Sequence, residues 1–160
     1  CNDSFLLLKA AAMQRDPELV SMARVAIERA YAPYSQYRVG AALRCSDGTV
    51  STGCNVENAS YGLTMCAERN AIFAAVAAGH RDFVRIVVAT ERSPVPYPCG
   101  ACLQVMSEWQ HDLQISVVCP EKTREGTLSQ FLPRRFVFKN GSHGADAHLD
   151  TEHPEGRETL

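Results

Sequence analysis

The sequence lacks any long apolar run, and this absence limits the class of protein that it encodes. No stretch of 18 or more apolar residues occurs in the 160 residues, whereas a membrane-spanning helix needs about 20. The short apolar stretch 5–8 is followed by Lys9 and preceded by Asp3 rather than by a basic region. It is therefore a poor match to a secretory signal peptide. We expect no membrane partner.

An excess of basic residues is also missing. The sequence has sixteen Lys and Arg residues and eighteen Asp and Glu residues, which gives a net charge of −2 at pH 7. Proteins that bind nucleic acid need a positive surface for the phosphates, so we expect no nucleic-acid partner. The 46% apolar and 21% charged residues are typical of a globular protein, and the length suits one domain with one core.

Cysteine, in contrast, is abundant. The seven cysteines are an odd number, so a secreted protein would keep at least one unpaired thiol. Closely spaced cysteines in a cytosolic protein more often bind metal or take part in chemistry, and we therefore expect a cytoplasmic protein. To four of the seven we assign no function: Cys1, Cys45, Cys54 and Cys119.

Turn residues and apolar spacing predict alternating helices and strands. Asp16-Pro17 is typical of a helix start, and apolar residues at helical spacing continue to Ala30, before the stretch 32–35 ends the helix. Strands at 39–45 and 49–56 flank Ser46-Asp47-Gly48, which predicts a hairpin. The other expected elements are helices at 66–78, 99–109 and 127–132, and strands at 86–89 and 115–119.

This order predicts one α/β domain, with helices that cover a mixed sheet. We assign residues 1–140 to it, and residues 141–160 to a polar tail that lies outside the core. The tail contains His143, His148 and His153, which we interpret as solvated side chains rather than metal ligands.

Two short segments carry the residues that indicate chemistry. Cys66-Ala67-Glu68 begins one expected helix, and Pro98-Cys99-Gly100-Ala101-Cys102 begins another. Cys99 and Cys102 are three residues apart, so both sulfurs face one side of a first helical turn. With Cys66 as a third ligand and water as a fourth, the set is typical of a catalytic zinc site. Buried free thiols are the alternative interpretation.

Glu68 lies two residues from one of these cysteines and is a candidate general acid and base. Zinc-dependent deaminases use such a pattern, in which a glutamate that does not bind the metal moves protons beside it. An ordinary solvated glutamate is the alternative interpretation.

Three segments, at 34–43, 53–71 and 98–106, resemble the cytidine deaminase family, and the similarity extends from about residue 16 to residue 138. The resemblance implies a three-layer α/β/α sandwich with a mixed five-stranded sheet. It implies zinc-dependent hydrolytic deamination of cytidine and deoxycytidine, for pyrimidine salvage. It also implies a homotetramer with one zinc ion per chain.

The resemblance also implies individual roles. Zinc is held by Cys66, Cys99 and Cys102, and Glu68 is the catalytic residue. The expected substrate contacts are Tyr37, Asn55, Glu57, Ala67, Ala59, Tyr61 and Phe136. Of these, Asn55 and Glu57 hold the ribose 3′-hydroxyl, Tyr37 lies against the pyrimidine, and Ala59, Tyr61 and Phe136 belong to a neighbouring subunit's site.

Arg69 has a supporting role on physical grounds as well. Three thiolates on Zn²⁺ leave a net charge of −1, which weakens the Lewis acid, and a guanidinium that donates to sulfur withdraws part of that charge. The family resemblance implies this role for Arg69, with Gln104 assisting.

Three positions depart from the family pattern. Tyr37 replaces a phenylalanine, Asn70 a threonine and Leu103 an arginine. Leu103 keeps a second substrate class open, a modified cytosine nucleoside such as a nucleoside antibiotic, whereas Asn55 and Glu57 favour ordinary nucleosides. The acidic charge disfavours a polynucleotide-editing deaminase. A non-catalytic zinc-stabilised module is disfavoured by the set of only three cysteine ligands and by Glu68.

Overall fold

The computed structural model describes residues 16–109 and 112–137. The predicted polar tail, its three histidines, Cys1 and the domain boundary after residue 140 lie outside these ranges. The division into a domain and a tail therefore stays a prediction.

The first described helix, α2 (Pro17–Ile27), begins as predicted but ends sooner. The Asp16 carboxylate caps it by accepting a hydrogen bond from the Leu19 N–H at 3.0 Å. The prediction that the helix continues to Ala30 was wrong. The chain leaves the helix because the Tyr31 N–H donates to the Asn55 carbonyl at 3.0 Å, which draws Tyr31 toward the sheet.

Within the described residues, five strands form one mixed sheet, as predicted: β1 (Val39–Cys45), β2 (Val50–Cys54), β3 (Phe83–Thr90), β4 (Gln114–Val118) and β5 (Thr123–Thr127). Their order is β2-β1-β3-β4-β5, and β3 and β4 run parallel while the other neighbours are antiparallel. The strand-by-strand prediction missed β5, whose sequence Thr-Arg-Glu-Gly-Thr has no alternating apolar residues.

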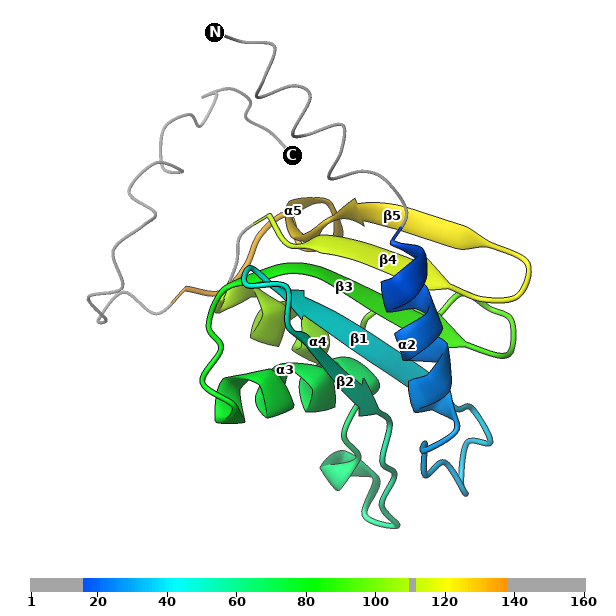
Figure 1. Cartoon of the computed structure of the whole chain (residues 1–160). Coiled ribbons are helices and arrows are strands. Elements are labelled where there is room, and N and C mark those ends of the chain that lie inside the picture. Colours follow the sequence, from blue (N-terminus) through cyan, green and yellow to red (C-terminus); the bar gives the residue numbers. More distant parts are fainter. Residues whose placement is uncertain (1–15, 110–111, 138–160) are drawn as a thin grey trace, which may run out of the picture.

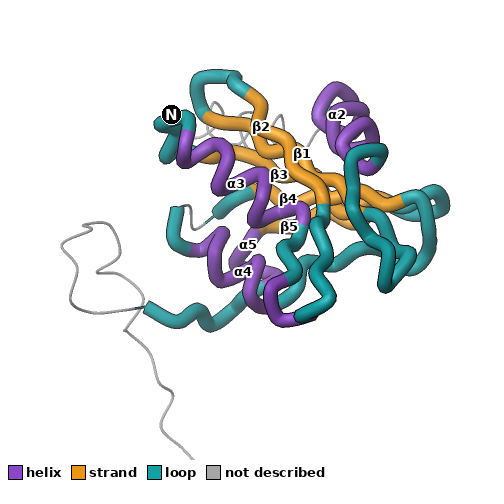
Figure 2. Tube along the Cα trace, turned by 90° about the horizontal axis from the view of Figure 1, so that it is seen from below, coloured by secondary structure: helices purple, strands orange, loops and turns teal. Residues whose placement is uncertain are grey.

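The part of the chain that the structure describes contains three further helices and one 3₁₀ turn: α3 (Ala67–Ala77), α4 (Gly100–Ser107), α5 (Leu128–Phe131) and η1 (Tyr61–Leu63). Helix α2 covers one face of the sheet, while α3 and α4 cover the other (Figures 1 and 2). The predicted three-layer sandwich is therefore confirmed. Within the described ranges, no helix is both long and apolar enough to cross a bilayer.

Apolar side chains pack on both faces of the sheet. Ala41 and Leu43 of β1 belong to the larger cluster, which includes residues of α3 and α4, and Ala42 between them belongs to the cluster under α2. This alternation follows from the two-residue period of a strand. The sheet is thus fixed against both helical layers, and the starts of α3 and α4 are held over the same face.

Gly53 near the end of β2 allows the close approach that brings this strand to α3. A Cβ atom at this position would collide with the main chain of Ala67 and Ala71. The segment that follows Gly53, which carries the predicted ribose contacts, is therefore held beside the start of α3.

Candidate metal and catalytic site

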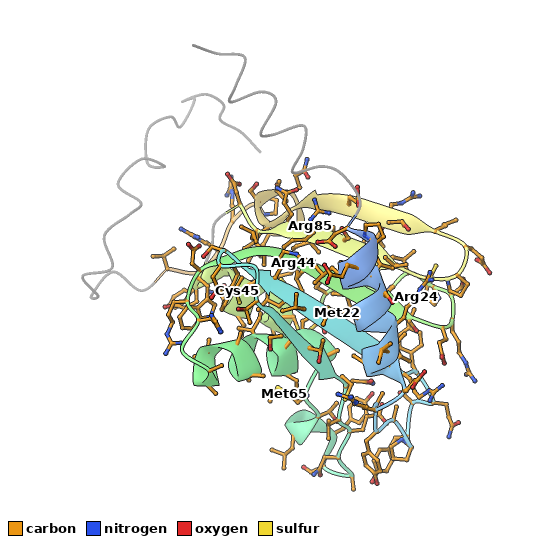
Figure 3. The ribbon with its side chains drawn as sticks, in the orientation of Figure 1. Met22, Arg24, Arg44, Cys45, Met65 and Arg85 are labelled. Carbon is orange, nitrogen blue, oxygen red and sulfur yellow. The ribbon has the colours of Figure 1, made fainter. Side chains whose placement is uncertain are left out.

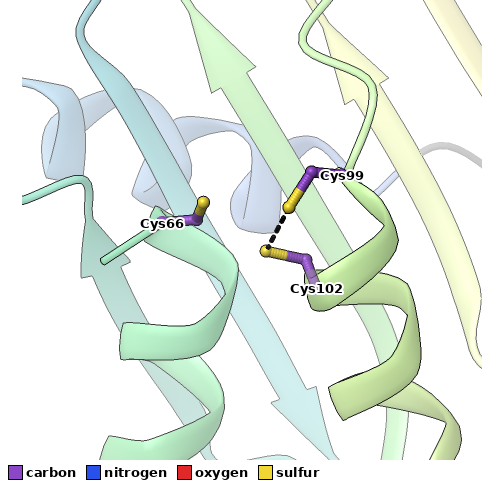
Figure 4. A group of neighbouring side chains, drawn as sticks. All are labelled: Cys66, Cys99 and Cys102. Carbon is purple, nitrogen blue, oxygen red and sulfur yellow. Dashed lines mark hydrogen bonds between the residues drawn. The ribbon is translucent and has the colours of Figure 1, made fainter. Parts of the chain in front are cut away.

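The three predicted zinc ligands converge between two helix starts (Figure 4). Cys66 is the residue before α3, Cys99 is the residue before α4, and Cys102 lies in the first turn of α4. The three sulfur atoms lie within 4.8 Å of one another, and the Cys99 and Cys102 sulfurs are 3.5 Å apart. Since helix N-termini carry partial positive charge, they favour thiolates at this place.

The electrostatics of the thiols favour a cation among them. A hydrogen bond from Cys102, with help from Arg69, lowers the pKa of Cys66 to about 5. The hydrogen bond to Cys66 together with burial raises the pKa of Cys102. One thiolate thus forms readily, and its charge opposes ionisation of the next.

This donor set fits zinc. Three cysteine sulfurs from two rigid helix starts are the soft ligands that Zn²⁺ prefers, and three protein ligands are typical of catalytic rather than structural sites. A divalent cation would also offset the repulsion between the thiolates of Cys66 and Cys102. Cys66, Cys99 and Cys102 are the residues that would hold it.

Arg69 lies where its predicted role requires. Its Nη2 atom is 3.4 Å from the Cys66 sulfur and 3.4 Å from the Thr64 carbonyl oxygen. Its Nε atom is buried and has no hydrogen-bond partner among the residues that the structure describes. The guanidinium therefore supplies positive charge directly beside a thiolate.

Glu68 is a buried carboxyl group, not a solvated one. It is 5% exposed in the first turn of α3. Burial, and then the negative charge of Cys66, raise its pKa to about 7. A carboxyl group with this pKa can both accept and donate a proton at neutral pH, which is what a general acid and base requires.

Asn55 and Tyr37 are joined through the main chain. The Asn55 amide nitrogen donates to the Tyr37 carbonyl oxygen at 2.8 Å, and its amide oxygen accepts from the Val39 N–H at 2.8 Å. Each end of the amide keeps capacity for one more hydrogen bond. The Tyr37 hydroxyl donates to the Pro94 carbonyl oxygen at 2.8 Å, which ties this ring to the loop before Cys99.

Glu57 is buried and anchors the segment before Tyr37. One of its carboxylate oxygens accepts from the main-chain N–H groups of Tyr34 and Ser35, at 2.9 and 3.2 Å. Although burial raises its pKa, these hydrogen bonds outweigh burial and lower the pKa of Glu57. It is thus a fixed anionic acceptor. Sequence reasoning missed this anchoring, because main-chain donors leave no pattern in the side chains.

Asn70, one of the departures from the family pattern, contacts the same segment. Its amide nitrogen donates to the Cys54 carbonyl oxygen at 2.8 Å, immediately before Asn55. The amide therefore links α3 to the end of β2.

The residues expected in a neighbouring subunit's site are on the surface. Ala59 is exposed, and Tyr61 and Phe136 are 62% and 71% exposed. Ala67, in contrast, is fully buried at the start of α3. This placement leaves the first three side chains free to reach another chain.

The Gln104 side chain contacts the segment that carries Phe136. Its side-chain amide donates to the Phe136 carbonyl oxygen at 2.9 Å and accepts from the Phe136 N–H at 3.2 Å. The amide thus holds the segment that carries Phe136, and the contact with the Cys66 sulfur comes from Arg69.

Leu103 is 7% exposed and belongs to the larger apolar cluster of the core. The leucine that replaces the family's arginine thus packs among apolar side chains.

Comparison with known proteins agrees with this geometry. The model of the cytidine and deoxycytidylate deaminase zinc-binding region matches residues 13–118. The chain is 48% identical to a cytidine deaminase of Halalkalibacterium halodurans over 134 residues, which cover 76% of this chain and 94% of the relative. A more distant relative is a blasticidin-S deaminase of Bacillus cereus, 30% identical over 132 residues, which cover 78% and 94%.

The fold also matches solved structures. A crystal structure of cytidine deaminase from Burkholderia pseudomallei aligns with a TM-score of 0.73 at 46% identity, over 77% of this chain and all of that one.

Proposed function

This chain belongs to the family of cytidine and deoxycytidylate deaminases, and on that premise we propose that it is a zinc-dependent hydrolase of cytidine and deoxycytidine, with uridine and deoxyuridine as products. The observation that carries the proposal is the buried Glu68, with a pKa raised to about 7, beside three converging cysteine sulfurs. A zinc site that only stabilises a fold does not require a carboxyl group that transfers protons.

The reaction adds water at C4 of the cytosine ring and releases ammonia. A zinc ion held by Cys66, Cys99 and Cys102 would lower the pKa of a water molecule to about 7 and so supply the nucleophile. Glu68 accepts a proton from the attacking water and delivers it to the ring nitrogen N3. It then takes the second water proton from the new C4 hydroxyl and passes it to the amino group, which leaves as ammonia. Arg69 withdraws charge from the Cys66 sulfur.

The hydrogen bonds that fix Tyr37, Asn55 and Glu57 support their proposed contacts with the substrate. Tyr37, fixed through its hydroxyl at Pro94, presents its ring face to the pyrimidine, beside Ala67. Asn55 and Glu57 use their remaining hydrogen-bonding capacity on the ribose 3′-hydroxyl. A modified cytosine nucleoside is the second candidate substrate. The 30% identity to a blasticidin-S deaminase favours it less than the 48% identity to a cytidine deaminase favours cytidine.

We further propose a cytoplasmic homotetramer that acts in pyrimidine salvage, with no nucleic-acid partner. The exposed apolar side chains of Tyr61, Leu63 and Phe136 support an assembly in which chains cover one another. Ala59, Tyr61 and Phe136 would then complete a neighbour's site. Light scattering should give a mass near four chains, and an active monomer would contradict the shared site.

The proposed reaction is tested by ammonia release from four compounds: cytidine, deoxycytidine, free cytosine and blasticidin S. We expect turnover of the two nucleosides and little turnover of cytosine, because the base alone lacks the 3′-hydroxyl. A preference for blasticidin S over cytidine would establish the second candidate. No ammonia from any of the four, by protein that contains zinc, would contradict the proposal.

A further inference from the structure

A second group of metal-binding side chains lies at the far end of α3 from the catalytic cysteines. Among the residues that the structure describes, Cys45, Asp47 and His80 also place one ligand atom each within 4.8 Å of the others. Cys66 directly precedes α3, whereas His80 follows its last residue by three positions. Since eleven helical residues span about 16 Å, the two groups are separate.

Two residues of the group, Cys45 and Asp47, are held in place by the β1–β2 hairpin. Cys45 is the last residue of β1 (Figure 3), its side chain is buried, and its N–H donates to the Thr49 carbonyl oxygen at 2.8 Å. Asp47 lies in the turn, where one carboxylate oxygen accepts from the Thr49 N–H at 2.9 Å. Gly48 has φ of +88°, a conformation that a glycine adopts without strain. The turn thus holds the thiol and the carboxylate on one side of the hairpin.

The helix side is equally fixed. His80 follows Gly79, whose φ of +98° ends α3, and the His80 N–H donates to the Ala75 carbonyl oxygen at 3.0 Å. This places the His80 Nδ1 atom 3.2 Å from the second carboxylate oxygen of Asp47. The imidazole and the carboxylate are therefore already at the separation that two ligands of one metal ion need.

We propose that Cys45, Asp47 and His80 form a second zinc site, which joins the β1–β2 turn to the end of α3. Thiolate, imidazole and carboxylate are the ligands of zinc in proteins, and in a tetrahedral site their atoms lie about 3.5 Å apart. An ion pair alone accounts for Asp47 and His80. Cys45 packs in the larger apolar cluster, and its sulfur also lies within 4.8 Å of a ligand atom of each of the other two residues. The Asp47 side chain is 53% exposed, so water can reach the fourth coordination position of the proposed zinc ion.

The surrounding charges are compatible with a cation. The Asp82 carbonyl oxygen accepts from the Ser46 N–H at 2.9 Å, which joins the residue before β3 to the turn. Both Arg44 and Arg81 lie near the group. Arg44, whose Nη1 contacts the Gly48 carbonyl oxygen at 3.4 Å, is paired with Asp16 and Glu18. Arg81 lies over the Trp109 ring, 5.5 Å from the centroid, and donates to the Val76 and His80 carbonyl oxygens. Its charge is thus held by other partners.

Metal stoichiometry tests this site in the intact enzyme. Protein with its catalytic zinc is dialysed against increasing Zn²⁺, and bound zinc per chain is measured by elemental analysis. We expect a second equivalent in the parent protein. The affinity for this second zinc ion should fall in each of three variants, His80→Gln, Asp47→Asn and Cys45→Ser. The loss should exceed the roughly 10–100-fold that follows removal of a residue that only hydrogen-bonds to a metal ligand. The Asp47 side chain is exposed and that of His80 is partly exposed, so these two variants decide the outcome even if Cys45→Ser does not fold.

The histidines of the tail provide the control, because they could bind zinc by themselves. A variant with His143, His148 and His153 changed to Gln should keep the second equivalent. Co²⁺ added to the zinc enzyme should give a sulfur-to-cobalt absorption that Cys45→Ser lacks. The proposal is overturned if the parent protein binds only one zinc ion per chain. It is also overturned if all three ligand variants keep the second zinc ion, or if the second zinc ion is lost when the tail histidines are changed.

Discussion

Replacing Leu103 by arginine restores the residue that the family has at this position, and we expect it to destabilise this protein. Leu103 is 7% exposed within an apolar cluster that includes Ile72 and Met106. The change removes about 1.5–3 kcal/mol of apolar burial, and the desolvation of an unpaired guanidinium adds several kcal/mol more. With at least about 3 kcal/mol lost, and roughly 2–4 °C per kcal/mol for a chain of this size, Tm should fall by about 6–12 °C.

The assay compares Tm, oligomer mass and turnover per bound zinc for Leu103→Arg and for the matched control Leu103→Met. The methionine variant keeps the volume and should lose less than about 1.5 kcal/mol. Turnover per bound zinc should stay near that of the parent in both, because Leu103 lies in the packing and not among the reacting groups. The reasoning is refuted if Leu103→Arg melts like the parent but prefers a different nucleoside.

Three further outcomes follow from the contacts of single side chains. Arg69→Met should lower zinc affinity by about 10–100-fold, measured by competition with a chelator, since the thiolates lose their neighbouring cation; unchanged affinity would contradict its role. Burial raises the pKa of Asp16, but its hydrogen bonds with Arg44 and Leu19 outweigh burial and lower the pKa. The Asp16–Arg44 pair therefore stabilises the fold at pH values above the unfolded pKa of roughly 3.9. This stabilisation is lost as the pH falls through the lowered pKa of the folded state. The Tm difference between the parent and Arg44→Met should therefore shrink from pH 7 to pH 3, and a constant difference would argue against the linkage. Glu57→Gln should reduce kcat/KM for cytidine by about 10–150-fold, the equivalent of one charge-assisted hydrogen bond, but should cause little further loss for 3′-deoxycytidine; equal losses on both substrates would indicate a structural role alone.

The sequence was most informative where local signals and packing agree. Asp16-Pro17 predicted the start of α2, and the spacing of Cys99 and Cys102 predicted their shared helical turn. Both depend on neighbours within four residues, so sequence alone was sufficient. The convergence of Cys66 with the other two required the family resemblance, because no local pattern predicts which helix starts lie side by side.

Other features depend on partners far away in the chain. The early end of α2 follows from the hydrogen bond between Tyr31 and Asn55, 24 residues later. The polar strand β5 exists because β4 offers it a paired edge. Gln104 bonds to the main chain of Phe136, a contact that no spacing predicts. Each requires knowledge of which backbone groups the fold leaves unpaired.

The most direct test of the central claim is Glu68→Gln, assayed for both zinc content and ammonia release from cytidine. Because Glu68 is not among the three sulfur ligands, the variant should fold and bind as much zinc as the parent. Because it moves the protons, turnover should fall by at least about 10²–10⁴-fold. Zinc retained with activity lost is the predicted result, and a zinc-loaded variant that releases ammonia at nearly the parent's rate would contradict the account.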